Sequence, residues 1–172
     1  MMPGPLVKRA LAAPNALYDT GLGRVLGHRF LRLTHHGRRS GRVYRTVLEV
    51  VAWRDGEAVV VAGLGRKAQW LRNAQAGAPL TVEIGKERWP ADFRVLDTAE
   101  ATATLADYER RNRLVAPVVR ALLTRLSGVR HDGTDAARRR IVEALPLVAF
   151  RPQSTRTGAP SRQAAMSSTA SR

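Results

Sequence analysis

The residues best suited to binding a charged ligand form a short stretch of two glycines, two arginines and a serine. The stretch is Gly37-Arg38-Arg39-Ser40-Gly41, and alternating apolar residues follow it. Glycine adopts backbone conformations closed to other residues and lets a ligand approach the chain closely. Arginine presents a planar fork suited to phosphate or carboxylate, and the N–H groups of tight turns can form concave anion sites. The sequence therefore predicts a cationic, anion-binding loop ahead of a β-strand.

The cysteine and histidine content gives little support for thiol, metal or catalytic-triad chemistry. The chain has no cysteine, which excludes disulfides and thiol catalysis, and its histidines are His28, His35, His36 and His131. These have neither metal-ligand spacing nor a paired carboxylate motif, so we expect no metal site. Catalytic-triad, Walker A and Rossmann patterns are missing as well. His35 and His36 are expected at a strand end beside the loop, lining a pocket, and the chain as a whole points to binding or cofactor chemistry.

The formal charge of +15 is the dominant feature of the composition, and 26 of the 29 basic residues are arginine. A GC-rich genome and an anionic partner both explain this excess. The partner could be nucleic acid, acidic lipid or a multiply charged cofactor. Nucleic acid is not expected, because no exposed aromatic pair suggests a stacking platform. No segment approaches the roughly 20 apolar residues of a membrane span, so we expect a cytoplasmic protein.

Apolar periodicity indicates the elements that hold the loop in place. Strands are predicted at residues 30–35, 43–53, 57–62, 80–84, 88–96 and 145–150, with Asp55-Gly56 as a hairpin turn. The strand at 43–53 is apolar on both faces, as in a strand buried on two sides or lining a barrel. Helices are expected at 66–76, from Thr98 as N-cap to about residue 112, at 115–126 and at 134–144. This order predicts an α+β fold: a small antiparallel β-barrel with flanking helices.

The length of the chain predicts one domain. We expect it to cover residues 1–152, opening with a basic helical lead segment over about residues 6–28. That segment would pack on its own domain or make a peripheral membrane contact. Residues 153–172 are rich in Ser, Thr and Arg and are expected to form a disordered tail. The sequence leaves the oligomeric state open.

Two stretches together resemble the deazaflavin (coenzyme F-420)-dependent nitroreductase and quinone reductase family. The first is LTHHGRRSGRVYRTVL, residues 33–48, which the Asp55-Gly56 hairpin follows. The second is VVAGLGRKAQWLRNAQAGAPLTVEI, residues 60–84, with a W-x-x-N pair on its expected helix. Either motif alone is weak, whereas the pair at this separation is fairly specific.

The resemblance implies a split β-barrel of the FMN-binding type that binds coenzyme F-420, an 8-hydroxy-5-deazaflavin with an anionic tail. FMN is the less favoured cofactor. The implied reaction is hydride transfer from the reduced cofactor to an electron-poor small molecule such as a quinone, enone or nitroarene. Such a site needs few catalytic side chains, and none is assigned here. The alternative is a non-catalytic protein of the same fold that binds a flavin, a deazaflavin or a fatty-acyl ligand.

The resemblance also assigns the cofactor-binding residues. The loop would hold the phosphate, Arg45 a phosphate or glutamate, and the backbone of Thr46 and Val47 the ring. The turn after the hairpin would pass beside the deazaflavin, and the helix would close the site. The assigned residues are Arg38, Arg39, Ser40, Gly41, Arg45, Thr46, Val47, Ala62, Gly63, Leu64, Gly65, Arg66, Gln69, Trp70 and Asn73.

The sequence departs from the family pattern in ways that bear more on the substrate than on the cofactor. One extra residue precedes Arg45, and Ala68 stands where a proline is usual. The tyrosines that line the family's substrate pocket have only Tyr108 as a candidate match. A structural interpretation also stands beside each assignment: Trp70 would be a core anchor, and the loop arginines would belong to a solvated turn.

Overall fold

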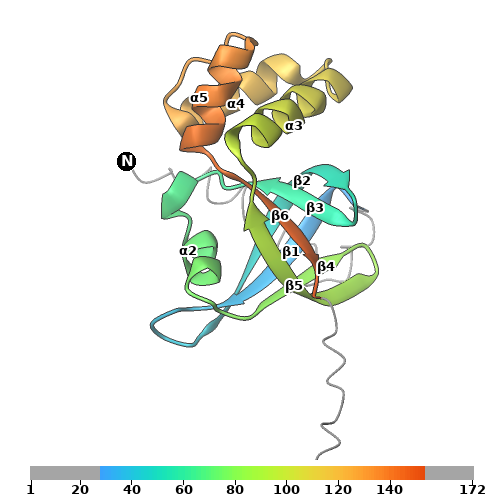
Figure 1. Ribbon diagram of the computed structural model, residues 1–172, viewed down its shortest axis with the longest axis vertical. Helices are drawn as coiled ribbons and strands as arrows, with labels where there is room; N and C mark the ends of the chain where they lie inside the picture. The colour runs from blue at the N-terminus through green and yellow to red at the C-terminus, as the bar shows by residue number, and fades with distance from the viewer. Residues whose placement is uncertain (1–27, 154–172) are drawn as a thin grey trace, which may run out of the picture.

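The computed structural model describes residues 28–153, so the predicted lead segment and nearly all of the predicted tail lie outside the described residues. Figure 1 shows a barrel of strands with a layer of helices above it. The strands are β1 (Phe30–His36), β2 (Val43–Arg54), β3 (Glu57–Val61), β4 (Leu80–Ile84), β5 (Glu87–Val95) and β6 (Leu147–Pro152). The helices are the short 3-10 turn η2 (Gly65–Lys67), α2 (Gln69–Gln75), α3 (Thr98–Arg111), α4 (Ala116–Ser127) and α5 (Asp135–Ala144).

The six strands close into one barrel in the order β1-β2-β3-β6-β5-β4, and all pairs are antiparallel. Asp55 and Gly56 both take positive φ, as the predicted β2–β3 hairpin requires. A β-bulge in β2, between Val50 and Ala52, bends this long strand from β1 toward β3. Pro90 lies within the β4–β5 ladder opposite Thr81, and its carbonyl accepts the N–H of Gln153, just beyond the end of β6. The predicted barrel with flanking helices is confirmed.

The core has two layers because the barrel wall is apolar on both sides. Leu31 and Leu33 of β1 are fully buried inside the barrel, as their alternation predicts. Phe150 of β6 is also buried there and packs against Trp70, with ring centroids 5.8 Å apart. Outside the barrel, apolar residues of β2, β3 and β6 pack against α3 and α5, with Leu105 and Ile141 almost completely buried.

Three local predictions differ from the structure. The helix expected over residues 66–76 is broken at Ala68, whose extended backbone (φ −55°, ψ 122°) separates η2 from α2. The N-cap of α3 is Asp97 rather than Thr98, since the Asp97 carboxylate accepts the N–H of Glu100 at 2.8 Å. The last strand begins at Leu147 instead of Leu145, because Leu145 is the C-cap of α5.

The prediction that the strand at 43–53 is buried on both faces holds only for Val51 and Ala52, since Trp53 at its end is 43% exposed. Val51 and Ala52 are buried, whereas Val43, Tyr44 and Arg45 are exposed. The first part of β2 runs past the end of β3, which pairs only from Val50 onward, so no β3 residue covers it. The exposed part of β2 instead forms a wall of the cavity described below.

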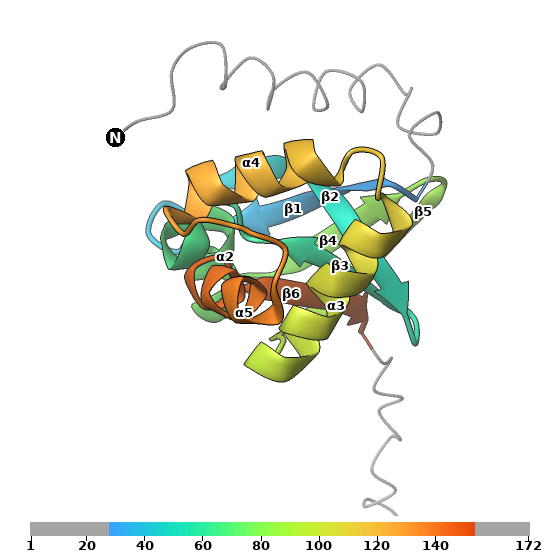
Figure 2. The same ribbon diagram turned by 90° about the horizontal axis from the view of Figure 1, so that it is seen from above.

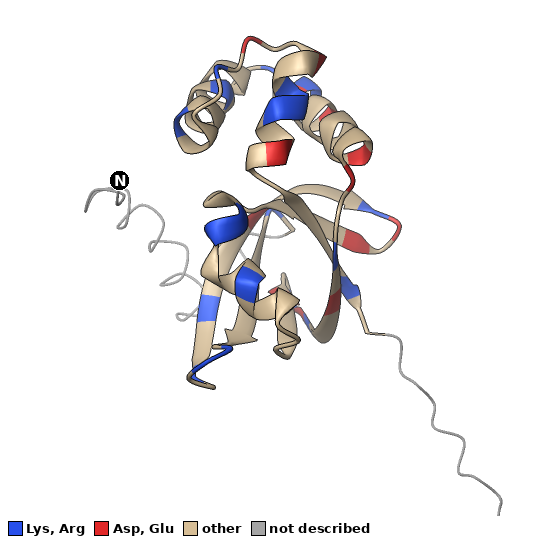
Figure 3. Ribbon diagram, turned by 60° about the vertical axis from the view of Figure 1, so that its left-hand side comes forward, with Lys and Arg blue, Asp and Glu red and all other residues tan. Residues whose placement is uncertain are grey.

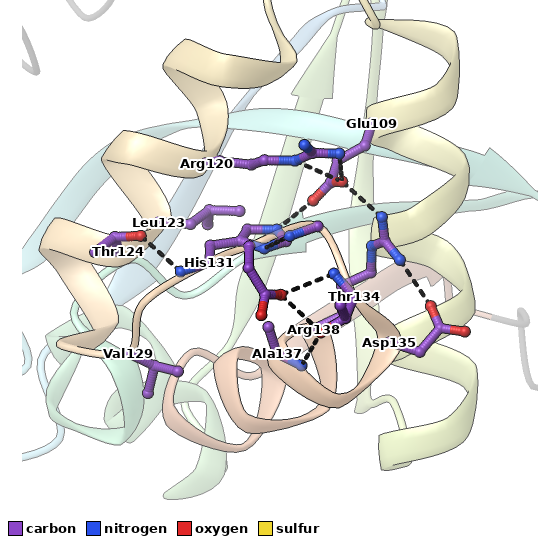
Figure 4. A network of polar contacts seen from close by, with 12 residues as sticks. Glu109, Arg120, Leu123, Thr124, Val129, His131, Thr134, Asp135, Ala137 and Arg138 are labelled. Carbon is purple, nitrogen blue, oxygen red and sulfur yellow. Dashed lines mark hydrogen bonds and ion pairs between the residues drawn. The ribbon is translucent and has the colours of Figure 1, made fainter.

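A buried ionic network holds α3, α4 and α5 together (Figure 4). The Glu109 carboxylate of α3 accepts hydrogen bonds from Arg120 of α4 at 3.0 Å and from Arg138 of α5 at 2.9 Å. His131 also contacts this carboxylate through Nε2, while the Gly133 N–H donates to His131 Nδ1 at 3.2 Å. Burial would raise the pKa of Glu109, but the bonds from Arg138 and Arg120 outweigh it and lower that pKa. The network therefore fixes where α4 lies over the barrel.

Candidate cofactor site

The loop between β1 and β2 is closed by its own backbone and needs both of its glycines. The Gly37 N–H donates to the Arg42 carbonyl at 2.8 Å, and the Gly41 N–H donates to the Gly37 carbonyl at 2.8 Å. Gly41 takes a φ of 64°. A Cβ on Gly37 would lie 2.6 Å from Ser40 Oγ and 2.9 Å from the Tyr44 ring. The predicted tight turn is therefore present, and its backbone is closed by two internal hydrogen bonds.

Asn73 of α2 ties this loop to the rest of the site. Its Oδ1 accepts the Arg38 backbone N–H at 3.2 Å and the Arg38 guanidinium at 3.0 Å. The same guanidinium nitrogen donates to Gln69 Oε1 at 3.0 Å. Trp70 and Asn73 share a helix face, as the W-x-x-N spacing predicts. Trp70 fills the core while Asn73, which is almost fully buried, holds the loop.

His35 lies beneath the cavity and completes the polar chain from the loop. Asn73 Nδ2 lies 3.0 Å from His35 Nδ1, and His35 Nε2 lies 3.4 Å from Thr46 Oγ1. Because Asn73 Oδ1 already accepts from Arg38, its amide nitrogen donates to Nδ1, which leaves the imidazole proton on Nε2. Burial, aided by the charge of His36, lowers the pKa of His35 and favours this neutral form. The His35 ring also stacks on Tyr44, with centroids 5.7 Å apart.

These elements enclose a cavity of about 720 Å³, a volume typical of cofactor pockets. It lies between the β1–β2 loop, the start of β2, the turn after β3, and α2. Eleven of the predicted residues line it: Arg38, Arg39, Ser40, Arg45, Thr46, Val47, Gly63, Leu64, Gln69, Trp70 and Asn73. Residues far apart in the sequence thus converge on one cavity.

The other four predicted residues do not line the cavity. Gly41 closes the back of the loop, and Ala62 is fully buried in the core. Gly65 has a φ of 59°, and a Cβ there would lie 2.5 Å from the Ala144 carbonyl of α5. Its position therefore serves the packing of η2 against α5. Arg66 is exposed on η2.

Several lining residues were not predicted as site residues. Tyr44 and Leu48 line the cavity on either side of Thr46. Period-two alternation from Thr46 could have found them. Gly37 and Ala68 also line the cavity, as does Leu126 of α4. Leu126 contacts the turn after β3, where its Cδ1 would lie 3.7 Å from a Cβ on Gly63. No local signal could have identified Leu126, because the packing of the helices alone brings it there.

The electrostatics of the cavity favour an anion. Arg38, Arg39 and Arg45 line it, and no acidic side chain does. Among residues 28–153, none of these arginines forms an ion pair. Figure 3 shows further basic positions on η2 and α2, where Arg66, Lys67 and Arg72 lie. Fixed backbone turns with several guanidinium groups are suited to phosphate and carboxylate ligands, so the donor set fits a cofactor with an anionic tail.

An antiparallel barrel with a cationic loop over a largely apolar cavity defines a class of protein whose site is suited to an anionic small-molecule ligand. The chain belongs to the F420H(2)-dependent quinone reductase family, whose sequence model matches residues 15–136. It is an oxidoreductase that uses coenzyme F-420, as the resemblance of its motifs implies. The family thus favours the enzyme over a non-catalytic binding protein.

Solved structures with a similar chain include an F420-H2 dependent reductase, FDR-A, at 18% identity and a TM-score of 0.46. That match covers 73% of this chain and 96% of the other. The heme storage protein HutZ from Vibrio cholerae matches at 11% identity and a TM-score of 0.42, covering 80% and 89%. An FMN-binding protein from Nostoc punctiforme, related to pyridoxamine 5'-phosphate oxidase, matches at 13% and 0.39, covering 82% and 78%. No curated protein matches the sequence. The family assignment therefore rests on the family model.

The described residues include no helix long and apolar enough to cross a membrane.

Proposed function

We propose that the 720 Å³ cavity is the cofactor site and that the β1–β2 loop binds the anionic tail of coenzyme F-420. The single observation that carries this proposal is the convergence of Arg38, Arg39 and Arg45 on a cavity without acidic residues. The loop N–H groups of Arg39 and Ser40 have no acceptor within residues 28–153, so they are available to an anion. Each charge-assisted bond is worth about 1.5–3 kcal/mol before ordering costs.

The three arginines have different roles in this proposal. Arg38 is already bonded to Asn73 and Gln69, so it fixes the shape of the loop as well as its charge. Arg39 and Arg45 have no such partner among the described residues, so their guanidinium groups are free to bind the ligand. Apolar side chains and Trp70 line the rest of the cavity and would exclude water from the ring. The bound cofactor supplies the hydride, while the protein supplies position and a dry environment.

We propose an electron-poor small molecule as the hydride acceptor: a quinone first, or an enone or nitroarene. Quinone reduction is the reaction named in the family description. The apolar lining beside the arginines, which includes Leu48, Leu64 and Leu126, supports an acceptor that is a flat apolar ring.

The experiment is a fluorescence titration of the full chain with reduced and oxidised coenzyme F-420, and with FMN and haem for comparison. We expect Arg39→Ala and Arg45→Ala each to weaken F-420 binding at least about tenfold, as the loss of one charge-assisted bond predicts. Arg88→Ala removes the same charge from an exposed position on β5 and serves as control, with unchanged affinity expected. Equal losses in all three variants would mean that only net charge matters and would refute the assigned site.

Turnover is tested with menadione as acceptor, following the loss of absorbance of the reduced cofactor. We expect oxidation that depends on the enzyme and falls in Arg39→Ala together with affinity. A flat trace with saturated cofactor, across quinone, enone and nitroarene acceptors, would instead support a flavin, deazaflavin or fatty-acyl binding protein.

We propose further that one domain ends near residue 152 and that residues 153–172 form a tail outside it. The observation behind this proposal is that β6, the last strand of the closed barrel, ends at Pro152. Limited proteolysis with mass spectrometry tests the boundary, since cleavage is expected after residue 152 and not within β6. A peripheral membrane contact through the N-terminal segment also remains a proposal and falls outside residues 28–153.

A further inference from the structure

The helix α4 carries two apolar faces where one would be enough to pack it. Its inner face uses Ala116 and Leu123, each 6% exposed, against the rest of the molecule. A second set recurs every four residues and is exposed: Leu114, which lies just before the helix, and Val118, Leu122 and Leu126 on the helix itself. We call this set the α4 ridge. Its side chains are 92%, 70%, 54% and 40% exposed in that order, so exposure falls toward the cavity. A surface-packed helix needs only one apolar stripe, and a contiguous exposed one marks an interaction site.

The ridge lies within a segment that carries only positive charge. Residues 110–131 include six arginines and no acidic residue. Three of the arginines are held within the molecule: Arg110 by Asp107, Arg111 by a carbonyl of β2 and Arg120 by Glu109. The remaining three, Arg113, Arg125 and Arg130, are exposed and form no ion pair among the described residues. An apolar helix face flanked by free arginines is the pattern of helices that lie in a membrane interface.

A second copy of the chain fits this surface less well. A standard dimer interface uses about 20–30 residues on each side, whereas the ridge has four. Pairing two ridges would also bring the arginines of one chain, Arg113, Arg125 and Arg130, close to the same arginines of the other, with no acidic residue to pair with them. An anionic lipid surface, in contrast, buries the apolar side chains and neutralises the arginines together.

We propose that the α4 ridge docks on an anionic lipid surface, with Arg113, Arg125 and Arg130 contacting the headgroups. Figure 2 shows α4 at the edge of the helical layer, with α3 and α5 on one side of it. The network around Glu109 holds α4 rigidly, so the ridge is a preformed surface. Because Leu126 also lines the cavity, docking places the cavity beside the lipid surface. The α4 ridge consists of residues other than those of the predicted lead segment, and the proposal does not depend on the cofactor assignment.

The test measures sedimentation of the full chain with vesicles of phosphatidylcholine, with and without phosphatidylglycerol, at physiological ionic strength. We expect binding to the anionic vesicles that the double variant Val118→Ser/Leu122→Ser weakens at least about tenfold. Both residues are exposed, so the variant should fold normally. The control is Val95→Ser, which removes a 39% exposed valine from β5 and should leave binding unchanged. Arg113→Gln/Arg125→Gln should weaken binding about fivefold for each charge removed.

The proposal is overturned if the full chain does not bind the anionic vesicles, or if Val118→Ser/Leu122→Ser binds them as tightly as the unchanged protein. Sedimentation velocity without lipid tests whether a second copy of the chain binds the ridge instead. A dimer that this double variant converts to a monomer would assign the ridge to a second copy and refute lipid docking. Coenzyme F-420 affinity, measured on the same samples, should be unaltered, so a failure of the cofactor site and a failure of the docking surface give different results.

Discussion

Replacing Asn73 tests the link between the loop and the helix most directly. Asn73→Leu keeps the size of the side chain but removes the acceptor for two Arg38 donors and the donor to His35. Each lost hydrogen bond costs about 0.5–1.5 kcal/mol, and a buried His35 nitrogen left unsatisfied adds about 1–3 kcal/mol. Because Arg38 is exposed, its donors can bond water in the variant, so we expect the free energy of unfolding to fall by about 2–4 kcal/mol in all. This corresponds to a fall in Tm of roughly 5–15 °C.

Asn73→Asp separates the loop contact from the His35 contact. A carboxylate still accepts from Arg38, but it cannot donate to His35 Nδ1, so the imidazole must carry a proton there. Burial lowers the pKa of His35 in the unchanged protein, so the unfolded chain binds more protons below the ordinary value of 6.5. Stability therefore falls as the pH drops below 6.5, by at most about 1.4 kcal/mol per pH unit from this group. In Asn73→Asp the carboxylate raises the pKa of His35, so this fall should shrink or reverse.

The assay is thermal or denaturant unfolding of the unchanged protein and both variants between pH 5 and 8 (roughly the range over which histidine titrates). Taking differences between proteins at each pH cancels the contributions of other titrating groups. NMR titration of the His35 ring gives a direct second readout. The reasoning is refuted if Asn73→Asp has the pH profile of the unchanged protein, or if Asn73→Leu costs less than about 1 kcal/mol.

Three further predictions concern parts of the fold outside the loop. Glu109→Gln removes the buried carboxylate that pairs with the part-buried Arg120 and Arg138, of which, within residues 28–153, only Arg138 keeps a second partner, Asp135, so we expect a loss of about 2–4 kcal/mol in denaturant unfolding. Since the pKa of Glu109 is lowered in the fold, its contribution is present above its ordinary pKa of 4.5 and should disappear as the pH falls below that value. Gly65→Ala should lower Tm more than Gly77→Ala, because both have positive φ but only Gly65 has a backbone oxygen where the Cβ would lie; equal shifts would contradict this. Burial and Glu49 raise the pKa of Tyr108 to about 12, so ultraviolet titration should show one tyrosine ionising near that pH. Because this tyrosine ionises at a lower pH in the unfolded chain, the folded protein should lose stability as the pH rises above 10.

The parts of the fold that could be predicted from the sequence depend on neighbouring residues. The Asp55-Gly56 turn and the alternation of Leu31 and Leu33 are decided within a few positions, so both predictions are confirmed. The prediction that Trp70 and Asn73 share a helix face is confirmed for the same reason, since residues three apart lie on one face wherever the helix is placed. What this spacing could not reveal is that Asn73 bonds the loop.

Where the predictions are wrong, longer-range packing or two similar residues decide the outcome. Asp97 and Thr98 are both good N-caps, and one position separates them, so propensity alone could not choose. The break at Ala68 lies between the buried Gly65 and the buried Trp70, whose contacts belong to different parts of the core. The network of Glu109 with His131 and two arginines joins three helices and has no sequence signature. Leu126 reaches the cavity only because that network positions α4.

The structure also bears on the two explanations of the high positive charge. Seven acidic residues outside the cavity pair with arginines there: Glu49, Glu57, Glu83, Glu100, Asp107, Glu109 and Asp135. If genome composition alone had set the arginine content, unpaired arginines would be scattered over the surface. Among residues 28–153, unpaired arginines do lie elsewhere, such as Arg139 and Arg140 of α5 and Arg151 of β6, so genome composition accounts for part of the excess. The cavity and the α4 ridge differ from those places because their unpaired arginines lie beside exposed apolar residues. Since Leu126 belongs to both the cavity and the α4 ridge, the proposed cofactor site and the proposed lipid surface lie on the same side of the molecule.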